Sequence, residues 1–151
     1  MREKYSLGGY FKNEGTKNDI KVEKFETDRS RCFYLFDVIP MGAVRMNRAD
    51  AWKKRDVVLR YFAYKDILRL QAKAMNFELG KVFDAVYFLP MPNSWSEKKK
   101  ERMNGMPCEV KPDTDNITKG LKDTFLKNDS MVWYEKAEKR WAYKGSILIY
   151  E

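Results

Sequence analysis

The amino-acid sequence predicts one α/β domain of the α+β class, with a mixed β-sheet of about four strands and two main helices. Three observations lead to this fold class. The chain has 151 residues, a usual length for a single domain. Hydrophobic residues make up 44% of it, which is enough to build a buried core. Segments typical of strands and helices follow one another in the order β-α-β-α-β-β, which indicates helices layered on a sheet.

Residues 1–31 are polar and rich in the turn formers Gly, Asn and Asp. We interpret them as an extension before the main domain, which spans residues 32–151, with a short strand expected over residues 20–25. The start of the chain has no apolar segment typical of a signal peptide. No other segment approaches the ~20 apolar residues that cross a bilayer. We therefore expect a cytoplasmic protein without a membrane partner.

The first strand and the first helix of the domain are predicted from composition and spacing. Residues 32–39 are rich in aromatic and β-branched side chains, which predicts a buried strand that ends at Pro40. Residues 55–77 carry apolar side chains at spacings of three and four, which predicts a long helix with its end near Gly80. The apolar side chains of this helix are Val57, Val58, Tyr61, Ile67, Leu68 and Leu70.

A second strand and a basic arm come next. Residues 83–89 are apolar except for Asp84 and predict a strand stopped by Pro90 and Pro92. Residues 93–102 form a connecting arm with four basic residues and one tryptophan, in which Ser96 is placed to cap a short helix. The arm is interpreted either as a mobile DNA-contacting element or as a solvated loop.

The remaining elements are a second helix and two strands. Residues 114–127 predict the helix, capped by Asp113 or Asp115. Its apolar stripe consists of Ile117, Leu121 and Phe125. Residues 132–143 and 147–150 are rich in strand-forming side chains around a glycine-containing turn, which predicts a terminal β-hairpin.

Charge and composition narrow the chemistry. The net charge of +8 favours polyanionic partners, nucleic acid first and anionic membrane second. The absence of histidine excludes His-based catalytic triads and zinc sites built on histidine. Cys32 and Cys108 are expected to be reduced thiols, because two distant cysteines make neither a zinc site nor a disulfide framework. The basic row on the first helix, expected either to be solvated or to face DNA, is Lys65, Arg69 and Lys73.

Two aspartates, Asp113 and Asp115, stand two residues apart just before the second helix. In an extended chain, such residues project to the same side, and adjacent carboxylates repel each other unless a cation lies between them. Mg²⁺ prefers oxygen ligands and takes one or two carboxylates together with water and phosphate. A cation held there would activate a bound water and offset phosphate charge, as phosphodiester cleavage requires. Lys119, one helical turn after Asp115, is placed to contact that phosphate.

Simpler interpretations of this segment exist. An EF-hand calcium loop would need glycine and glutamate where Thr118 and Thr124 stand, and is excluded. One of the two aspartates can serve as a plain helix cap, and Lys119 can be a solvated residue paired with Asp123. Asp129 follows a helix about 20 Å long, so spacing alone does not bring it to the aspartate pair. A shorter helix or a partner subunit would.

The acidic segment resembles the core of RusA-type Holliday junction resolvases, a family common in phages and prophages. The shared pattern is Asp-X-Asp-Asn-X-X-Lys, a helix, and then Asn-Asp leading into a strand. Here this pattern is carried by residues 111–119, Asp123 and residues 128–132. The likeness spans roughly residues 33–150. Further similarity to phage members lies in residues 88–96, Lys98, Lys99, Lys100, Ile39, Pro40, Arg45 and Arg48.

The resemblance implies a homodimeric endodeoxyribonuclease that resolves four-way junctions and other branched DNA with paired, symmetric nicks, in a bacterium or a phage-infected host. It implies Mg²⁺ as cofactor, with Mn²⁺ as a substitute. The implied metal-binding and catalytic residues are Asp113, Asp115 and Asp129, with Lys119 as the catalytic lysine. The expected DNA contacts are Arg45, Arg48, Lys98, Lys99, Lys100 and Lys111. The rival hypothesis is a catalytically silent nucleic-acid-binding module of the same fold, against which the carboxylates argue because they repel phosphate.

Overall fold

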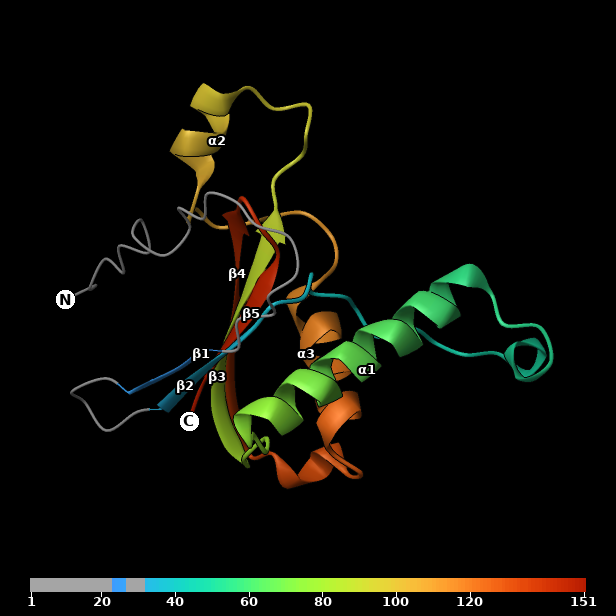
Figure 1. Ribbon diagram of the computed structural model, residues 1–151. Coiled ribbons are helices and arrows are strands. Elements are labelled where there is room, and N and C mark those ends of the chain that lie inside the picture. Colours follow the sequence, from blue (N-terminus) through green and yellow to red (C-terminus); the bar gives the residue numbers. More distant parts are fainter. Residues whose placement is uncertain (1–22, 27–31) are drawn as a thin grey trace.

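The computed structural model describes residues 23–26 and 32–151, which form one sheet covered by helices (Figure 1). The strands are β1 (Glu23–Glu26), β2 (Cys32–Phe36), β3 (Val82–Pro90), β4 (Tyr134–Ala142) and β5 (Ser146–Tyr150). The α-helices are α1 (Asp56–Met75), α2 (Glu97–Met103) and α3 (Thr114–Phe125), with short 3-10 turns η2 (Arg48–Ala51) and η3 (Asp129–Met131). The predicted α+β class and the mixed sheet are confirmed.

The sheet has five strands in the order β1-β2-β5-β3-β4. Strands β3 and β4 run parallel, and the other neighbouring pairs run antiparallel. The additional strand is β1, which pairs with β2 at the edge of the sheet and is contributed by the expected extension. The short strand predicted over residues 20–25 therefore exists, although it is described only from Glu23 onward.

The predicted terminal hairpin is wrong. Strands β4 and β5 are consecutive in the chain, but β3 lies between them and pairs with both. An interior position suits β3, because its side chains are mostly buried on both faces, as is usual for interior strands. Tyr87 and Ala85 face the main core, while Val86 and Phe88 belong to a second apolar cluster. The charged strand β4 takes the edge position, where charged side chains discourage further strand pairing.

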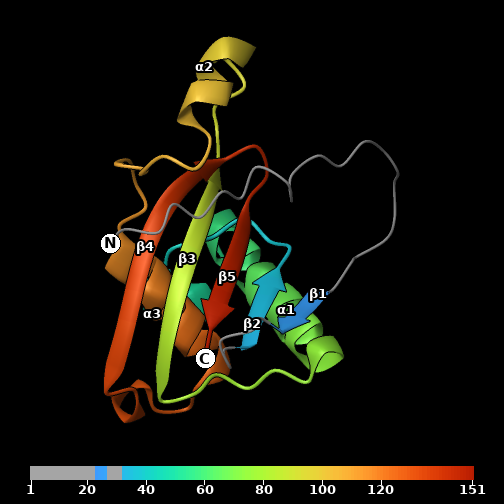
Figure 2. The same cartoon turned by 90° about the vertical axis from the view of Figure 1, so that its left-hand side faces the viewer.

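Helices α1 and α3 pack side by side on one face of the sheet, and α2 projects beyond the end of the sheet (Figures 1 and 2). The helix α1 buries a different stripe from the predicted one. Val58, Tyr61 and Leu68 are buried as predicted, but Ile67 and Leu70 are exposed. The buried stripe continues instead through Tyr64, Gln71, Ala72 and Met75. Apolar side chains thus occupy two faces of α1, of which only one packs on the core.

The helix ends follow local chemistry closely. Helix α1 ends at Met75, and the next residue, Asn76, adopts the left-handed conformation (φ 53°) that terminates helices, so the predicted end near Gly80 is wrong. Helix α3 ends at Phe125, two residues earlier than predicted. The predicted cap of the arm helix is confirmed, since the Ser96 side chain accepts a hydrogen bond from the Lys99 amide. Among the described residues, no helix combines the length and the apolar character needed to span a membrane.

Candidate active site

Helix α3 carries most of the acidic segment, and a buried hydrogen-bond relay fixes its first turns to the sheet. The Tyr87 hydroxyl on β3 donates to Thr118 Oγ1 at 3.0 Å, and Thr118 Oγ1 donates to the Thr114 carbonyl at 2.9 Å. Burial raises the pKa of the Tyr87 phenol well above its ordinary value, so the hydroxyl keeps its proton and remains a donor. The relay thus joins the centre of the sheet to the beginning of α3.

The loop before α1 approaches α3 closely at two glycines. The Ala43 amide donates to the Asn116 carbonyl at 3.0 Å. A Cβ atom on Gly120 would lie 3.1 Å from the Met41 backbone carbonyl, and one on Gly42 would meet the end of the Asn116 side chain. The absence of a side chain at Gly120 thus helps the loop backbone to lie against the helix.

The segment that precedes Asp113 is held by a lysine that the sequence analysis did not single out. Lys139 on β4 donates from Nζ to the carbonyls of Val110 at 2.6 Å and Pro112 at 2.8 Å. Lys139 and Tyr87 occupy paired positions of the parallel strands β4 and β3, so neighbouring positions of the sheet anchor both the segment and the helix. No local pattern marked Lys139, because it is one of several charged residues along an edge strand.

Asp113 and Asp115 begin helix α3 as exposed carboxylates. Asp113 occupies the N-cap position, as one of the predicted alternatives had it, but its side chain makes no capping hydrogen bond. Asp115 lies in the first helical turn. Among the described residues neither carboxylate has a hydrogen-bond or ion-pair partner, so both oxygen pairs remain available to a ligand.

Asp129 lies beside α3 rather than at a distance from it. Lys119 Nζ is 3.5 Å from Asp123 Oδ1 and 3.9 Å from Asp129 Oδ2. This follows from the early end of α3 at Phe125 and from η3, where the Asn128 side chain accepts a bond from the Ser130 amide and reverses the chain. Because Lys119 stands one turn after Asp115, it links the two parts of the predicted site. Spacing in the sequence left this arrangement open.

These aspartates are not preassembled around a cation. Within residues 23–26 and 32–151, no three His, Cys, Asp or Glu side chains lie close enough together to hold a metal ion. The donor chemistry of Asp113 and Asp115 nevertheless fits Mg²⁺, which takes one or two carboxylates and completes its shell with water and phosphate oxygens. Asp129 is instead occupied by Lys119.

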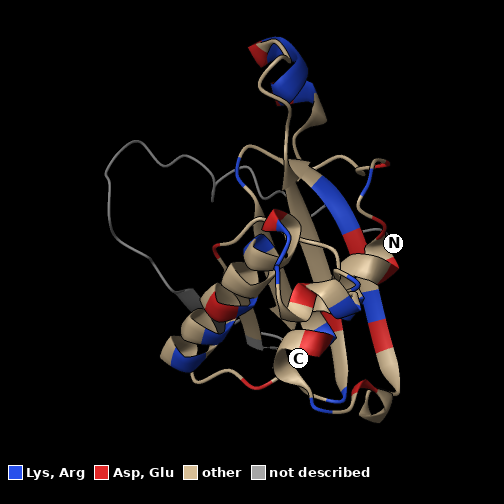
Figure 3. Ribbon diagram, turned by 90° about the vertical axis from the view of Figure 1, so that its right-hand side faces the viewer, with Lys and Arg blue, Asp and Glu red and all other residues tan. Residues whose placement is uncertain are grey.

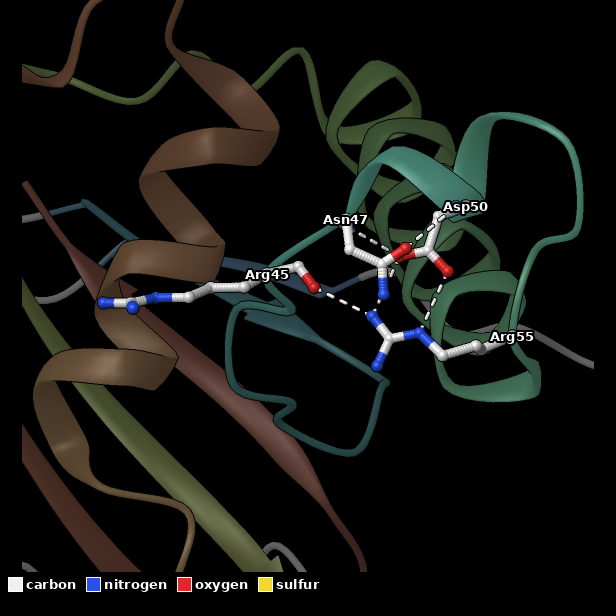
Figure 4. Close-up of polar contacts among 4 residues, drawn as sticks. All are labelled: Arg45, Asn47, Asp50 and Arg55. Carbon is white, nitrogen blue, oxygen red and sulfur yellow. Dashed lines mark hydrogen bonds and ion pairs between the residues drawn. The ribbon is translucent and has the colours of Figure 1, made fainter.

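A folded loop presents the first group of predicted DNA contacts. The Arg55 guanidinium donates to both Asp50 carboxylate oxygens at 2.9 Å and to the Arg45 carbonyl at 2.9 Å. Asn47 and Asp50 form a reciprocal capping box, and the Arg55 guanidinium and the Asn47 amide lower the pKa of Asp50 to about 2. The Arg45 side chain extends away from this cluster (Figure 4), and Arg45 and Arg48 are both exposed.

The arm presents the second group. Helix α2 has no buried residue and is mostly basic (Figure 3). Lys98 is exposed, Lys99 Nζ lies 4.0 Å from the Trp95 ring centroid, and Lys100 pairs with Glu97. Lys111 is exposed directly before Pro112. The arm lysines thus lie on a helix that projects beyond the sheet, whereas Lys111 lies in the segment just before α3.

The basic row on α1 is largely engaged within the protein. Arg69 donates from Nε to the Thr124 carbonyl at 3.2 Å, which satisfies the last turn of α3. Lys65 lies over the Tyr61 ring, with Nζ 5.4 Å from its centroid. Of the two cysteines, only Cys108 has a described side chain, and it is a free, buried thiol.

The sequence model of the family Endodeoxyribonuclease RusA matches residues 43–150, which is more than half of the chain and includes the loop, the arm, α3 and β4. No curated protein and no solved structure matches the chain. The family match confirms the resemblance stated from the sequence. The chain therefore belongs to the RusA family of endodeoxyribonucleases, Holliday junction resolvases whose substrate is branched DNA.

Proposed function

We propose that this chain resolves four-way DNA junctions by Mg²⁺-dependent hydrolysis, with Mn²⁺ as a substitute, and that a homodimer places the paired, symmetric nicks. The observation that carries the proposal is the arrangement at α3. Two carboxylates without a protein partner in the described residues stand at its first turn, and Lys119 reaches from the next turn to Asp129.

Asp113 and Asp115 are the proposed principal metal ligands, because their oxygens are exposed and uncommitted. Asp129 is the proposed third acidic residue. When bound, a divalent cation supplies charge neutralisation at the phosphate and an activated water nucleophile. The Asp113 side chain does not cap α3, and we propose that the first-turn amides donate to a phosphate oxygen.

Lys119 is the proposed electrostatic stabiliser of the scissile phosphate. Its ammonium is shared between Asp123 and Asp129 in the free protein, at distances longer than a close hydrogen bond. The lysine side chain is more than half exposed and therefore retains the freedom to turn toward DNA. We propose that it donates to a phosphate oxygen as negative charge develops there.

Arg45, Arg48, Lys98, Lys99, Lys100 and Lys111 are the proposed DNA contacts. Arg45 and Arg48 lie on the loop before α1, the three consecutive lysines lie on α2, which projects beyond the sheet (Figure 1), and Lys111 lies between α2 and α3. Contacts of this kind bind phosphates without reading sequence, so branched shape would be the main determinant of recognition.

The proposed dimer has a candidate surface on α1. Leu59, Ile67 and Leu70 are exposed on this helix, Leu70 to 62%. Ala63 and Ala74 are also exposed and continue the same side at helical spacing. A continuous apolar stripe on a helix needs a covering surface. A two-fold partner would cover it and would present two identical sites to a junction that is itself close to two-fold symmetric.

The test is incubation of the purified chain with a labelled four-way junction and with linear duplex of the same sequence, in Mg²⁺, in Mn²⁺ and in EDTA. The expected result is paired nicks in the junction that depend on the divalent cation. Junction binding without nicks in either cation would instead support the silent module. A thermal titration adds a second readout, since divalent cations should raise the melting temperature of a metal-binding enzyme.

A further inference from the structure

We infer that a cavity at the base of the arm receives an unpaired nucleobase of the junction, close to the phosphate that is cut. The cavity has a volume of about 480 Å³. Its walls include Trp95, Met103, Met106, Glu109, Val110 and Trp141. The inference deepens the proposed nuclease function and rests on it, because it names the part of the DNA that this surface holds.

The walls have the chemistry of a base-stacking site. The Trp95 and Trp141 rings lie with their centroids 5.1 Å apart, and Trp141 is buried while Trp95 is half-buried. Met106 and Val110 are 49% and 50% exposed, so this apolar surface is only partly used by the fold itself. Aromatic and apolar side chains of this kind stack on the flat faces of unpaired bases.

The single charged wall residue distinguishes a base from a phosphate. Glu109 offers an exposed carboxylate at the cavity. A carboxylate repels phosphate but accepts hydrogen bonds from the N–H groups on the edge of a base. Phosphates are attracted instead by the neighbouring helix α2, four of whose seven residues are Lys or Arg. Lys99 of this helix lies over Trp95, so the basic surface and the aromatic cavity are in direct contact.

The cavity is held in shape by β4. The Trp141 amide donates to the Met106 carbonyl at 2.9 Å, and the Gly105 amide donates to the Trp141 carbonyl at 2.8 Å. The Arg140 side chain donates to the Gly105 carbonyl at 2.8 Å. Gly105 adopts a positive φ of 78°, which favours glycine and allows the chain to turn here. A preformed cavity reduces the entropic cost of ordering the protein when a ligand binds.

The cavity adjoins the proposed active site through Val110. The Val110 carbonyl is one of the two that Lys139 holds, and Asp113 follows only three residues later. Three residues of extended chain span at most about 10 Å, which corresponds to roughly three steps of 3.4 Å along a DNA strand. An unpaired base in the cavity would therefore belong to a nucleotide within a few positions of the cut phosphate. Such bases are more accessible at a branch point than in a continuous duplex.

The experiment is a double-mutant cycle that combines changes in the cavity with changes in the DNA. The measured quantity is the affinity for the junction, and every protein also carries Asp115→Asn so that the DNA is not cut. A series of junctions is used, each with one abasic nucleotide at a different position around the branch point. Met106→Ala is the principal variant, because Met106 is half exposed and its truncation should leave the fold intact. Trp95→Ala is the second variant. Met131→Ala is the matched control, since Met131 is equally exposed (50%) and lies outside the cavity.

The expected result is that Trp95→Ala weakens binding of the intact junction by roughly 5- to 150-fold, the range measured for one stacked base, and Met106→Ala by less. For one or two abasic positions near the cut, the protein with the native cavity should bind the abasic junction more weakly than the intact one, by the same factor. The cavity variants should bind the abasic and the intact junctions almost equally. The effect of Met131→Ala on binding should add to the effect of the abasic nucleotide at every position. Additive effects at every position for both pocket variants would overturn the inference. Absence of cutting by the native chain would instead defeat the proposed function, and that assay is independent of these binding data.

Discussion

Lys119 Nζ lies 3.9 Å from Asp129 Oδ2, although the two residues belong to different elements separated by the end of α3. The same ammonium lies 3.5 Å from Asp123 one turn further along the helix. Asp129 is thereby brought next to the helix that begins with Asp113 and Asp115. Among the described residues, however, Asp129 does not join Asp113 and Asp115 in a group close enough to hold a metal ion.

Asp115→Asn is expected to abolish junction cutting and to leave junction binding within a few-fold of the native value. The amide removes a metal-binding charge while preserving the shape of the side chain. Rates of cutting and gel-shift affinities measure the two effects separately. The control is Asp56→Asn, which changes the first-turn aspartate of α1 at a distance from the site. Retained cutting in the Asp115 variant would defeat the metal-site assignment.

Lys119→Gln is expected to lower the rate constant of cutting by about 10²- to 10³-fold, the usual effect of removing one donor to a developing oxyanion. Affinity for the junction should change little, because the contact is proposed to form mainly in the transition state. Single-turnover kinetics with saturating enzyme measure the rate constant directly. Lys119→Arg should recover part of the rate. An equal loss of rate in Asp123→Asn would indicate that the Lys119–Asp123 pair, rather than the lysine itself, matters.

Tyr87→Phe is expected to lower the free energy of unfolding by about 1 kcal/mol. The variant removes the buried donor to Thr118 Oγ1 while keeping the packed ring. Urea denaturation measures the change, with Tyr143→Phe on the exposed turn after β4 as a control that should be neutral. Because the relay fixes the beginning of α3, the cutting rate should fall as well. A loss of stability without any effect on the cutting rate would show that the hydrogen-bond relay does not position the active site.

The loop that carries Arg45 and Arg48 is expected to lose stability in acid through Asp50. The folded pKa of Asp50 is about 2, below its ordinary value of 3.8. Its bonds to Arg55 therefore stabilise the fold above pH 3.8, and this contribution disappears as the pH falls through about 2. The difference in unfolding free energy between the native chain and Asp50→Asn, measured from pH 7 to pH 2, should be constant at first and then shrink. A difference that grows in acid would contradict the assignment.

Leu70→Glu is expected to convert a dimer to a monomer, because it places a charge in the centre of the exposed apolar stripe of α1. Sedimentation velocity over a range of concentrations measures the change. Glu78→Lys, at an exposed position after α1, is the control for a change of charge alone. A native chain that sediments as a monomer at all concentrations would overturn the proposed dimer surface.

The features that the sequence predicted are those with local causes. The strand at β3 follows from a mostly apolar segment that ends at Pro90, and α3 follows from its regular apolar stripe. The cap at Ser96 follows from the affinity of a serine hydroxyl for a free helical amide. The acidic motif around Asp113 and Asp115 could likewise be recognised in the sequence, because its residues are close together along the chain.

The features that only the tertiary structure decided depend on contacts between distant segments. Strand β3 lies between β4 and β5, where its mostly buried side chains suit the interior of the sheet and the more exposed, charged β4 suits the edge. Asp129 reaches Lys119 because α3 ends two residues early, and Lys139 fixes the segment before Asp113 because β4 runs parallel to β3. The pattern of neighbouring residues in the sequence does not predict these arrangements, since each depends on the packing of the whole domain. The sequence alone thus determined the chemistry available to this protein, and the fold determined which groups meet.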